Sequence, residues 1–408
     1  MSLGVLALIG ICGLCGPLLS ASARGAIPAV IGEIVAGVMI GRTGLQVLDT
    51  SNPTLTFLAD IGFLMLMFSV GMRIPLNDAR VRACSGRGSA AAGAVAVLAI
   101  GAGALVSMIG AIGHPAVYAV LIASGSAAVV LPVIQERRLD GPEVLTVIAQ
   151  VTVADVAATI AIPFVLKPAR AAEAAIGSLL VAVSVIAIWS LVRAVRGREL
   201  VHSLRRESKR RRWVLDLRLA LIVLFGLAWI AERTSASLLI AGFGAGLMVA
   251  AIGGPKRLST QVLGVADGFF VPLFFVVLGA RIDLRGLVQD PTMIGLAVAL
   301  VGLTAAVHVL AAWATRQPRA AGLLASAQLG VPAAIVALGL SEHVLTATQG
   351  AAVVTAAIIS LAVCSVGAAA LARASNSGSE QVRGGEPASA RTSDSAPTTD
   401  SAAASQAT

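Results

Sequence analysis

Thirteen long apolar runs follow one another along this 408-residue chain, and they constrain its fold more than any other feature. A helix needs about 20 apolar residues to cross a hydrocarbon layer of roughly 30 Å. Only 12% of the residues are charged, which excludes an ordinary soluble domain and predicts an all-α polytopic membrane protein. We place the spans at residues 4–22, 27–41, 54–73, 88–113, 115–136, 141–166, 172–192, 214–231, 236–253, 260–280, 292–315, 319–341 and 345–372.

The positive charges predict how the chain is oriented. Of the 30 lysines and arginines, all but six fall on one side of the predicted membrane, and cytoplasmic loops are the ones enriched in such residues. We therefore expect a plasma-membrane protein with its N-terminus outside and its C-terminus in the cytoplasm. The most basic loop, 193–213, is interpreted as an anchor on anionic lipid, not as a nucleic-acid site. The six exceptions are Arg42, Lys167, Arg170, Arg233, Arg281 and Arg285.

Motifs of the first half recur in the same order in the second half. "GMRIPL" (71–76) matches "GARIDL" (279–284), "LIASGS" (121–126) matches "LLASAQ" (323–328), and Gly37 matches Gly246. Matching spans are seven apart, an odd number, so the two copies must lie upside down relative to each other. The predicted divisions are a six-helix repeat at 1–167, a linker helix with a basic cytoplasmic loop at 168–213, an inverted six-helix repeat at 214–373, and a disordered cytoplasmic tail at 374–408.

Two matching spans carry helix-breaking residues in their middle. "ASGSAAVVLPV" (123–133) and "SAQLGVPAAIV" (326–336) each combine small residues with a proline, which removes a backbone donor. The symmetric placement predicts that the fifth and twelfth helices are discontinuous and cross beside a binding cavity. Simple kinks are the alternative.

A single carboxylate, Asp155, interrupts the run from 144 to 166. It lies about fourteen residues into its span, near the middle of the bilayer at a rise of 1.5 Å per residue. An ionised acid there is costly, so such residues usually belong to ion or proton pathways. Its counterpart in the second half, near Ala357, is apolar, which argues against a structural need. The alternative is a carboxylate that only hydrogen bonds to neighbouring helices.

Other ionisable residues in the spans have competing interpretations. His308 is either a satisfied core residue or a functional one, and Glu33 either packs helices together or lines a funnel. Asp60 and Asp267 match each other near span ends, which favours a structural role. Arg73 and Arg281 lie at span ends, where long side chains can extend to the interface.

Several stretches together resemble one known family. They are "IPAVIGEIVAGVMIG" with "LADIGFLMLMFSVGMRI", "SGSAAVVLPVIQERRL", and "GFFVPLFFVVLGARIDL". Over residues 20 to 370 or so, the chain resembles the monovalent cation:proton antiporters of the bacterial Na+/H+ exchanger-like, second subfamily. The resemblance implies the Na+/H+ antiporter-like fold, with thirteen helices in inverted repeats. It also implies a moving core made of helices four to six and eleven to thirteen, a dimerising panel made of the others, and elevator-like alternating access by a homodimer.

The resemblance also assigns roles at the site. Asp155 falls on the family's ion-binding acid, but the preceding position, usually Asp, Asn or Gln, is Ala154. His308 falls where many members have a lysine that pairs with that preceding acid, so both partners are replaced together. Ser126 takes the place of a hydroxyl residue near the ion, and Thr152, three residues before Asp155, offers another oxygen. Glu33 and Arg281 are expected as accessory residues.

The predicted function is therefore exchange of a monovalent cation, Na+ or K+, for protons, with no resident cofactor and no nucleic-acid partner. An enzyme is not expected, because no second midplane acid and no His and Cys cluster accompany Asp155. A proton-coupled exporter of a larger compound, or a non-transporting membrane sensor, remain alternatives. With one acid and a neutral His308, we expect one-for-one electroneutral exchange, and a titrating His308 would change that count.

Overall fold

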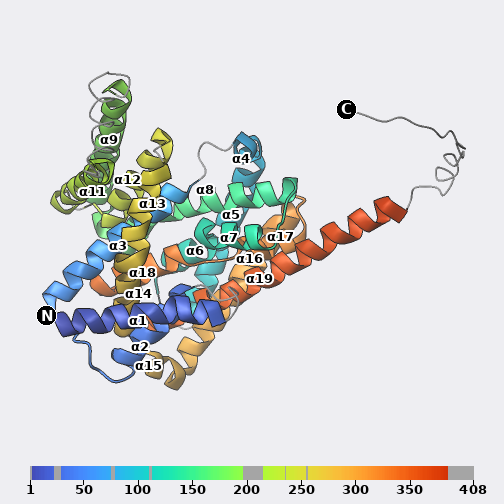
Figure 1. Ribbon diagram of the computed structural model, residues 1–408. Coiled ribbons are helices and arrows are strands. Elements are labelled where there is room, and N and C mark those ends of the chain that lie inside the picture. The colour runs from blue at the N-terminus through green and yellow to red at the C-terminus, as the bar shows by residue number, and fades with distance from the viewer. Residues whose placement is uncertain are drawn as a thin grey trace, which may run out of the picture.

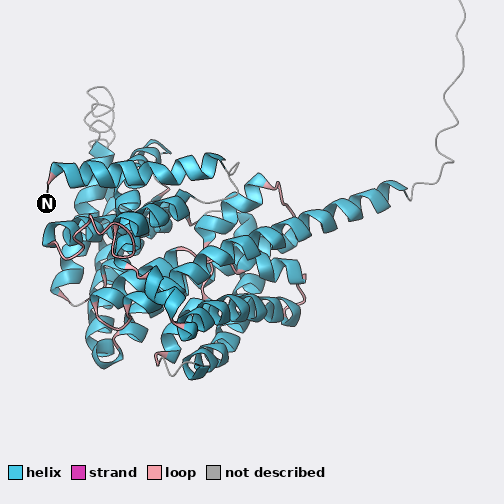
Figure 2. Cartoon of the chain, turned by 90° about the horizontal axis from the view of Figure 1, so that it is seen from below, coloured by secondary structure: helices cyan, strands magenta, loops and turns pink. Residues whose placement is uncertain are grey.

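The computed structural model describes residues 2–22, 29–74, 79–109, 113–195, 215–234, 236–253 and 256–384. Within these ranges every regular element is a helix, as Figure 2 shows, which confirms the predicted all-α class. Those before the basic loop are α1 (Leu3–Ser22), α2 (Ala29–Ile40), α3 (Pro53–Arg73), α4 (Ala79–Ala83), α5 (Ser85–Ile109), α6 (Pro115–Ala123), α7 (Ala127–Glu136), α8 (Pro142–Leu166), η1 (Pro168–Arg170) and α9 (Ala171–Val195). Those after it are α11 (Leu215–Arg233), α12 (Leu238–Ile252), α13 (Lys256–Val265), the π-helical turn η2 (Ala266–Phe270), α14 (Val271–Arg281), α15 (Leu284–Gln289), α16 (Pro291–Ala314), α17 (Arg319–Ala325), α18 (Gly330–Ser341) and α19 (Ala347–Gly384).

The helices account for all thirteen predicted spans. In the described part of the chain, eight helices are long and apolar enough to cross a membrane, or nine when the bent pair α17–α18 counts as one span. Two shorter apolar helices, α2 and α12, match the two short predicted runs. The pair α6–α7 and the helix α11, which carries charges near both of its ends, supply the last two.

Local capping explains where several spans begin. The Asn52 side chain accepts a hydrogen bond from the backbone N–H of Thr54 at 3.0 Å, and Pro53 opens α3. Asp290 caps α16 in the same way, accepting from the backbone N–H of Thr292 at 2.9 Å. These side chains satisfy donors that the first turn of a helix leaves free, which is why polar residues and proline stand at these boundaries.

The helices pack as two groups. One group consists of α5, α6–α7, α8, α16, α17–α18 and α19, which pack mainly against one another. In the other, α12 packs along α3, α14 along α2, and α1 against α2, while α9 and α11 contact α12. Figure 1 shows α9, α11 and α12 at one side of the molecule and α5, α16 and α17 toward the other. We call the first the core group and the second the panel group. The motion implied for them by the family resemblance stays a prediction.

Two helix crossings in the panel group require glycine. A methyl group on Gly37 of α2 would overlap the carbonyl oxygen of Val276 in α14. At the matching position, a methyl group on Gly246 of α12 would overlap the carbonyl oxygen of Phe68 in α3. Without side chains at these points the helix backbones touch, which is how membrane helices commonly gain packing energy.

The partner helices of the same two crossings, α14 and α3, also need glycine at the point of contact. A methyl group on Gly279 of α14 would overlap the carbonyl of Ile34, and one on Gly71 of α3 would overlap the carbonyl of Phe243. Ile34 and Phe243 each precede a crossing glycine by three residues, and so do Val276 and Phe68. The α2–α14 and α12–α3 crossings are thus related position by position, which supports the repeat inferred from sequence. The exact repeat boundaries stay a prediction.

The end of the chain departs from the predicted tail. Helix α19 continues to Gly384, past the predicted start of the tail at residue 374, and projects from the bundle in Figure 1. A helix nucleated by a long apolar span can extend through residues such as Ala and Glu at little cost per added residue. Residues 385–408 lie outside the described part of the chain.

The crossings predict a selective effect of one methyl group. Gly246→Ala should lower the free energy of unfolding by about 1–3 kcal/mol, the usual cost of overpacking. A methyl group on Gly226 of α11 would have no neighbouring atom within 4 Å, so Gly226→Ala is the matched control and should be neutral or slightly stabilising. Thermal unfolding of the detergent-solubilised variants measures both, and equal stability would contradict the close crossing.

Candidate functional site

Each of the two predicted broken helices is interrupted by a short non-helical segment. Residues 124–126 separate α6 from α7, and residues 326–329 separate α17 from α18, whose axes differ by 41°. The Ser124 hydroxyl donates to the Leu121 carbonyl at 2.7 Å, and the matching Ser326 hydroxyl donates to the Leu323 carbonyl at 2.8 Å. Discontinuous helices are confirmed here, but the breaks lie at these serines, ahead of the prolines, because the hydroxyls take the place of backbone donors.

The two breaks lie against each other and against α8. A methyl group on Gly125 would lie 3.1 Å from the Val151 side chain of α8 and 3.3 Å from the Ala325 carbonyl oxygen. The Gln328 side chain in the second break donates from Nε2 to the Leu121 carbonyl oxygen at 2.6 Å. Two half-helix ends and the middle of α8 therefore meet inside the core group.

Asp155 lies on α8 at this meeting point. Its side chain is buried, with 3% of the residue exposed, and its carboxylate faces the backbone N–H of Ala127, the first residue of α7. The positive end of a helix dipole favours a negative charge at that place. The second oxygen, Oδ2, is buried and has no hydrogen-bond partner, and no cationic side chain in the described part of the chain pairs with Asp155. A buried carboxylate in this position has capacity to take up a proton or a cation.

Ser126 lies at the end of α7 that faces Asp155, and Thr152 lies on α8 one turn from Asp155. Ser126 is the N-cap residue of α7, directly before Ala127, and is buried, yet its hydroxyl makes no capping bond. Thr152 lies one turn before Asp155 and donates its hydroxyl proton to the Ile148 carbonyl at 2.7 Å. A hydroxyl oxygen that donates can still accept or coordinate through its lone pairs.

His308 is not brought to Asp155. It is buried in α16, where its Nδ1 lies 2.9 Å from the carbonyl oxygen of Thr304 one turn earlier. Because a carbonyl only accepts, Nδ1 carries the proton in this contact. The backbone of Gly322 in α17 packs directly on the His308 carbonyl. Among the described residues, no hydrogen bond or ion pair joins His308 to Asp155.

Ala154 lies in apolar surroundings. It lines an apolar cavity of about 380 Å³ between α5, α6 and α8, together with Ala92, Ala123 and Ala158. An ionised acid at this position would therefore face alanines, with no cation beside it among the residues that line this cavity.

Sequence reasoning missed Gln328, which ties four elements together. Its backbone N–H donates to the Ser360 hydroxyl of α19 at 3.1 Å, and its Nε2 also lies 3.4 Å from the Thr304 hydroxyl of α16. Gln328 matches Ser126 in the aligned motifs "LIASGS" and "LLASAQ", which was the one signal that could have pointed to it. The partners are separated by up to 207 residues, so only the fold reveals them.

A cavity of about 290 Å³ lies between the two groups, and we call it the polar cavity because charged side chains line it among apolar ones. Arg281 and Asp60 line it from the panel group, and Lys167 and Glu342, paired at 2.7 Å, line it from the ends of α8 and α18. It reaches α8 at Pro163, eight residues beyond Asp155 and about 12 Å away along the helix axis. Arg281 donates to the Thr56 hydroxyl at 2.9 Å, so it bonds within the protein and lies apart from Asp155.

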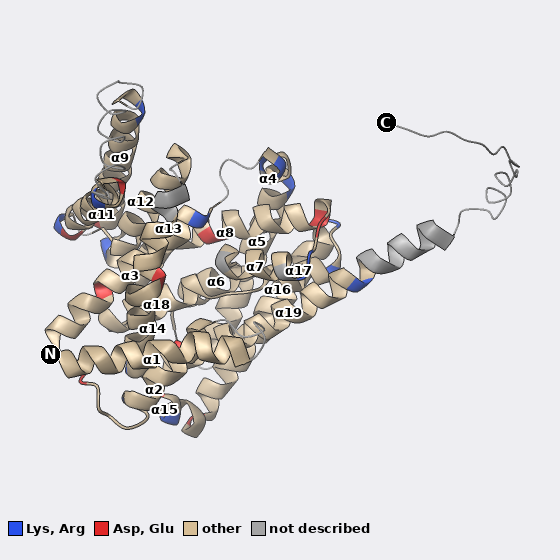
Figure 3. Cartoon of the chain, in the orientation of Figure 1, with Lys and Arg blue, Asp and Glu red and all other residues tan. Residues whose placement is uncertain are grey.

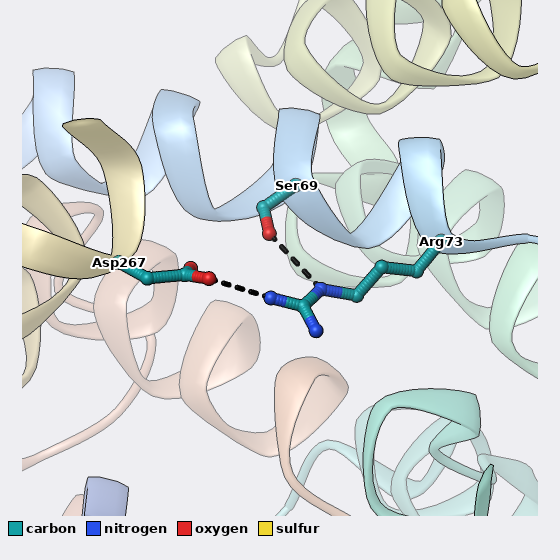
Figure 4. A network of polar contacts seen from close by, with 3 residues as sticks. All are labelled: Ser69, Arg73 and Asp267. Carbon is teal, nitrogen blue, oxygen red and sulfur yellow. Dashed lines mark hydrogen bonds and ion pairs between the residues drawn. The ribbon is translucent and has the colours of Figure 1, made fainter. Parts of the chain in front are cut away.

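The ends of α3 and α14 carry matching charges. Arg73 pairs with Asp267 at 2.6 Å and donates from Nε to the Ser69 hydroxyl at 3.3 Å, as Figure 4 shows. At the other end of the same two helices, Arg281 faces Asp60 across the polar cavity. Both arginines were expected to extend to the interface, but each instead engages the neighbouring helix. Figure 3 shows how sparse charges are elsewhere within the bundle.

Known proteins are similar to this chain in sequence and fold. The family model described as sodium/hydrogen exchanger, transmembrane, matches residues 5–374. The chain is 25% identical over 365 residues to the putative Na+/H+ antiporter YjbQ of Bacillus subtilis, covering 84% of this chain and 59% of that protein. It is 28% identical to the glutathione-regulated potassium-efflux system protein KefC of Klebsiella pneumoniae, covering 75% of this chain and 47% of that protein.

A solved structure extends the match to the fold. The sodium proton antiporter MjNhaP1 of Methanocaldococcus jannaschii superposes with a TM-score of 0.61 at 16% identity, covering 91% of this chain and 97% of that chain. The chain spans about three fifths of the length of YjbQ and about half of that of KefC. With a family model matched over nearly its whole apolar region, this multi-pass membrane protein belongs to the transmembrane sodium/hydrogen exchanger family.

Proposed function

We propose that this protein is a secondary active transporter that exchanges a monovalent cation, Na+ or K+, for protons at Asp155. The observation that carries the proposal is a buried carboxylate with an unpartnered oxygen, placed where two broken helices meet. The names of the relatives support both cations, since they include Na+/H+ antiporters and a potassium-efflux system. The relatives are transporters, which favours a transporter over an enzyme.

The exchange follows from the electrostatics of Asp155. When the carboxylate is ionised, the backbone N–H of Ala127 satisfies one side of it, and the other side attracts a cation. The hydroxyl oxygens of Ser126 and Thr152 and carbonyls at the helix breaks are suitable further ligands for a hard cation. A proton on the carboxylate removes the charge that holds the cation. Because only one of them can neutralise Asp155, binding of one expels the other.

Alternating access would come from movement of the core group against the panel group. The polar cavity lies between these groups and approaches α8 from one face of the molecule, which suits an entry path on that face. We extend the proposal to a homodimer that contacts through the panel group, in the plasma membrane, with the N-terminus outside and the C-terminus in the cytoplasm.

Replacing the carboxylate tests the proposal directly. Asp155→Asn keeps the shape of the side chain but cannot release a proton at neutral pH, so cation-dependent collapse of a proton gradient in proteoliposomes should fall at least about 100-fold. Asp140→Asn changes an acid in the exposed turn before α8 and should exchange at the wild-type rate. Na+, K+ and Li+ are compared in the same vesicles. Full activity of Asp155→Asn would refute the role of Asp155, and a wild type that responds to none of the three cations would favour an exporter of larger compounds or a sensor.

The exchange should be electroneutral. One proton and one monovalent cation carry equal charge, and we expect His308 to stay neutral because it is buried and, among the described residues, no hydrogen bond or ion pair joins it to an acid. Exchange rates in vesicles held at imposed potentials of either sign should agree, and His308→Gln should leave the pH profile in place. A rate that changes steeply with voltage would show instead that net charge moves in each cycle.

Gln328 should matter for both stability and transport. Gln328→Leu removes one donor to the Leu121 carbonyl, which keeps the Ser124 hydroxyl, so the expected cost is about 0.5–1.5 kcal/mol in unfolding free energy. The exchange rate should fall with it, because the α6 end no longer holds its place beside α8. Gln289→Leu, at the exposed end of α15, is the control. If the Gln328→Leu protein unfolds and transports like wild type, the Gln328 contacts do not hold the breaks together.

A further inference from the structure

A second buried carboxylate, Glu33, lies in the panel group, away from Asp155. It is 5% exposed, and it projects from α2 toward α1. The missing side chain of Gly16 makes room for it, since a methyl group there would lie 2.8 Å from Cγ of Glu33. The Glu33 Oε2 atom is fully buried and has no hydrogen-bond partner. Packing alone does not account for a carboxylate placed in this way, because an apolar side chain of similar size would avoid the cost of desolvation.

Glu33 opens onto a cavity of about 240 Å³ between α1, α2 and the start of α14. A second acid, Asp267, lines the same cavity from the π-helical turn η2. The remaining lining consists of apolar residues and glycines, namely Ile9, Gly10, Gly13, Leu14, Pro17, Ala29, Gly268, Phe269 and Pro272. The cavity therefore offers two carboxylates and no other side-chain oxygen.

Among the described residues, the charges around this cavity do not balance if Glu33 is ionised; Arg24, in the loop between α1 and α2, lies outside them. Arg73 of α3 pairs with Asp267 and with the Ser69 hydroxyl, so its charge is already matched. Helices α1 and α2 contain no lysine or arginine, and Arg281 lies at the opposite end of α14. On α13, Lys256 and Arg257 have side chains outside the described part of the chain. An ionised Glu33 would add a second negative charge beside Asp267.

We propose that Glu33 is a proton-binding site of the panel group, distinct from Asp155, and that it holds its proton at neutral pH. A proton fits better than a metal ion, because a desolvated Na+ or K+ needs several oxygen ligands and the cavity provides two carboxylates, one of them engaged by Arg73. The proposal is independent of exchange at Asp155. It places a titrating group in the part of the molecule that the family resemblance treats as the fixed panel.

Infrared spectroscopy can detect this proton. The purified Asp155→Asn protein, at pH 7 in a buffer without metal cations, should give a carbonyl stretching band from a protonated carboxyl group. The double variant Asp155→Asn, Glu33→Gln should lose that band. Glu173→Gln on the Asp155→Asn background changes an exposed acid at the start of α9 and should keep it. A band that persists unchanged in the Glu33 variant, or that is absent from Asp155→Asn at pH 7, overturns the proposal.

Thermal unfolding gives a second test on the same proteins. The folded state prefers the neutral form of Glu33, so the melting temperature of Asp155→Asn should fall as the pH rises from the ordinary range of a glutamate, about 4, to above neutrality. Glu33→Gln on that background imitates the protonated form and should flatten this fall. If Na+ or K+ restores the melting temperature at high pH, the site binds a metal ion and the proposal fails. Should the glutamine variant not fold, Glu33→Asp keeps a carboxyl group and should keep an infrared band at a shifted frequency.

Discussion

The structure depends on giving hydrogen-bond partners to the backbone groups at the ends of half-helices, because these ends lie inside a bundle that is surrounded by hydrocarbon. Each break exposes carbonyls at the end of one half-helix and N–H groups at the start of the next, and no bulk water is present there to bond them. At the first break, the Leu121 carbonyl receives the Gln328 amide, and the N–H of Ala127 faces Asp155. A donor thus meets the negative end of α6, and an acid meets the positive end of α7. The site forms where the end of α6 needs a hydrogen-bond donor and the start of α7 needs an acceptor.

This arrangement explains how the site tolerates its departures from the family pattern. The resemblance leads one to expect Asp, Asn or Gln at position 154 and, in many members, a lysine at position 308, whose charge would offset that of an acid at 154. Here Ala154 faces an apolar cavity, and His308 bonds to a carbonyl of its own helix. Replacing both residues leaves no unpaired charge behind, whereas replacing one would. The Leu121 carbonyl accepts from Gln328 as well as from the Ser124 hydroxyl, and this neutral amide is buried at little electrostatic cost once it is bonded.

The sequence predicted those features that depend on local chemistry or on length. The thirteen spans follow from apolar run length, and the breaks follow from small residues and proline placed symmetrically. Asp155 is identifiable because an acid in the middle of an apolar run is costly and seldom serves packing alone. Contacts between distant segments were not predictable, since the Gln328–Leu121 and Arg73–Asp267 pairs join residues 207 and 194 positions apart. The end of α19 was missed because composition alone does not show where a nucleated helix stops.

The two buried acids differ in what surrounds them, and this difference separates their roles. Asp155 faces the N-terminus of α7, which favours its ionised form and supports the proposed exchange of a proton there. Glu33 faces a second acid and an apolar wall, so none of the described residues that line its cavity stabilises a negative charge on it. Two carboxylates buried to a similar degree are therefore expected to behave differently: one changes its occupant, and the other keeps its proton. Burial sets the free energy that ionising a carboxylate requires, and the neighbouring helix dipoles determine whether that free energy is offset.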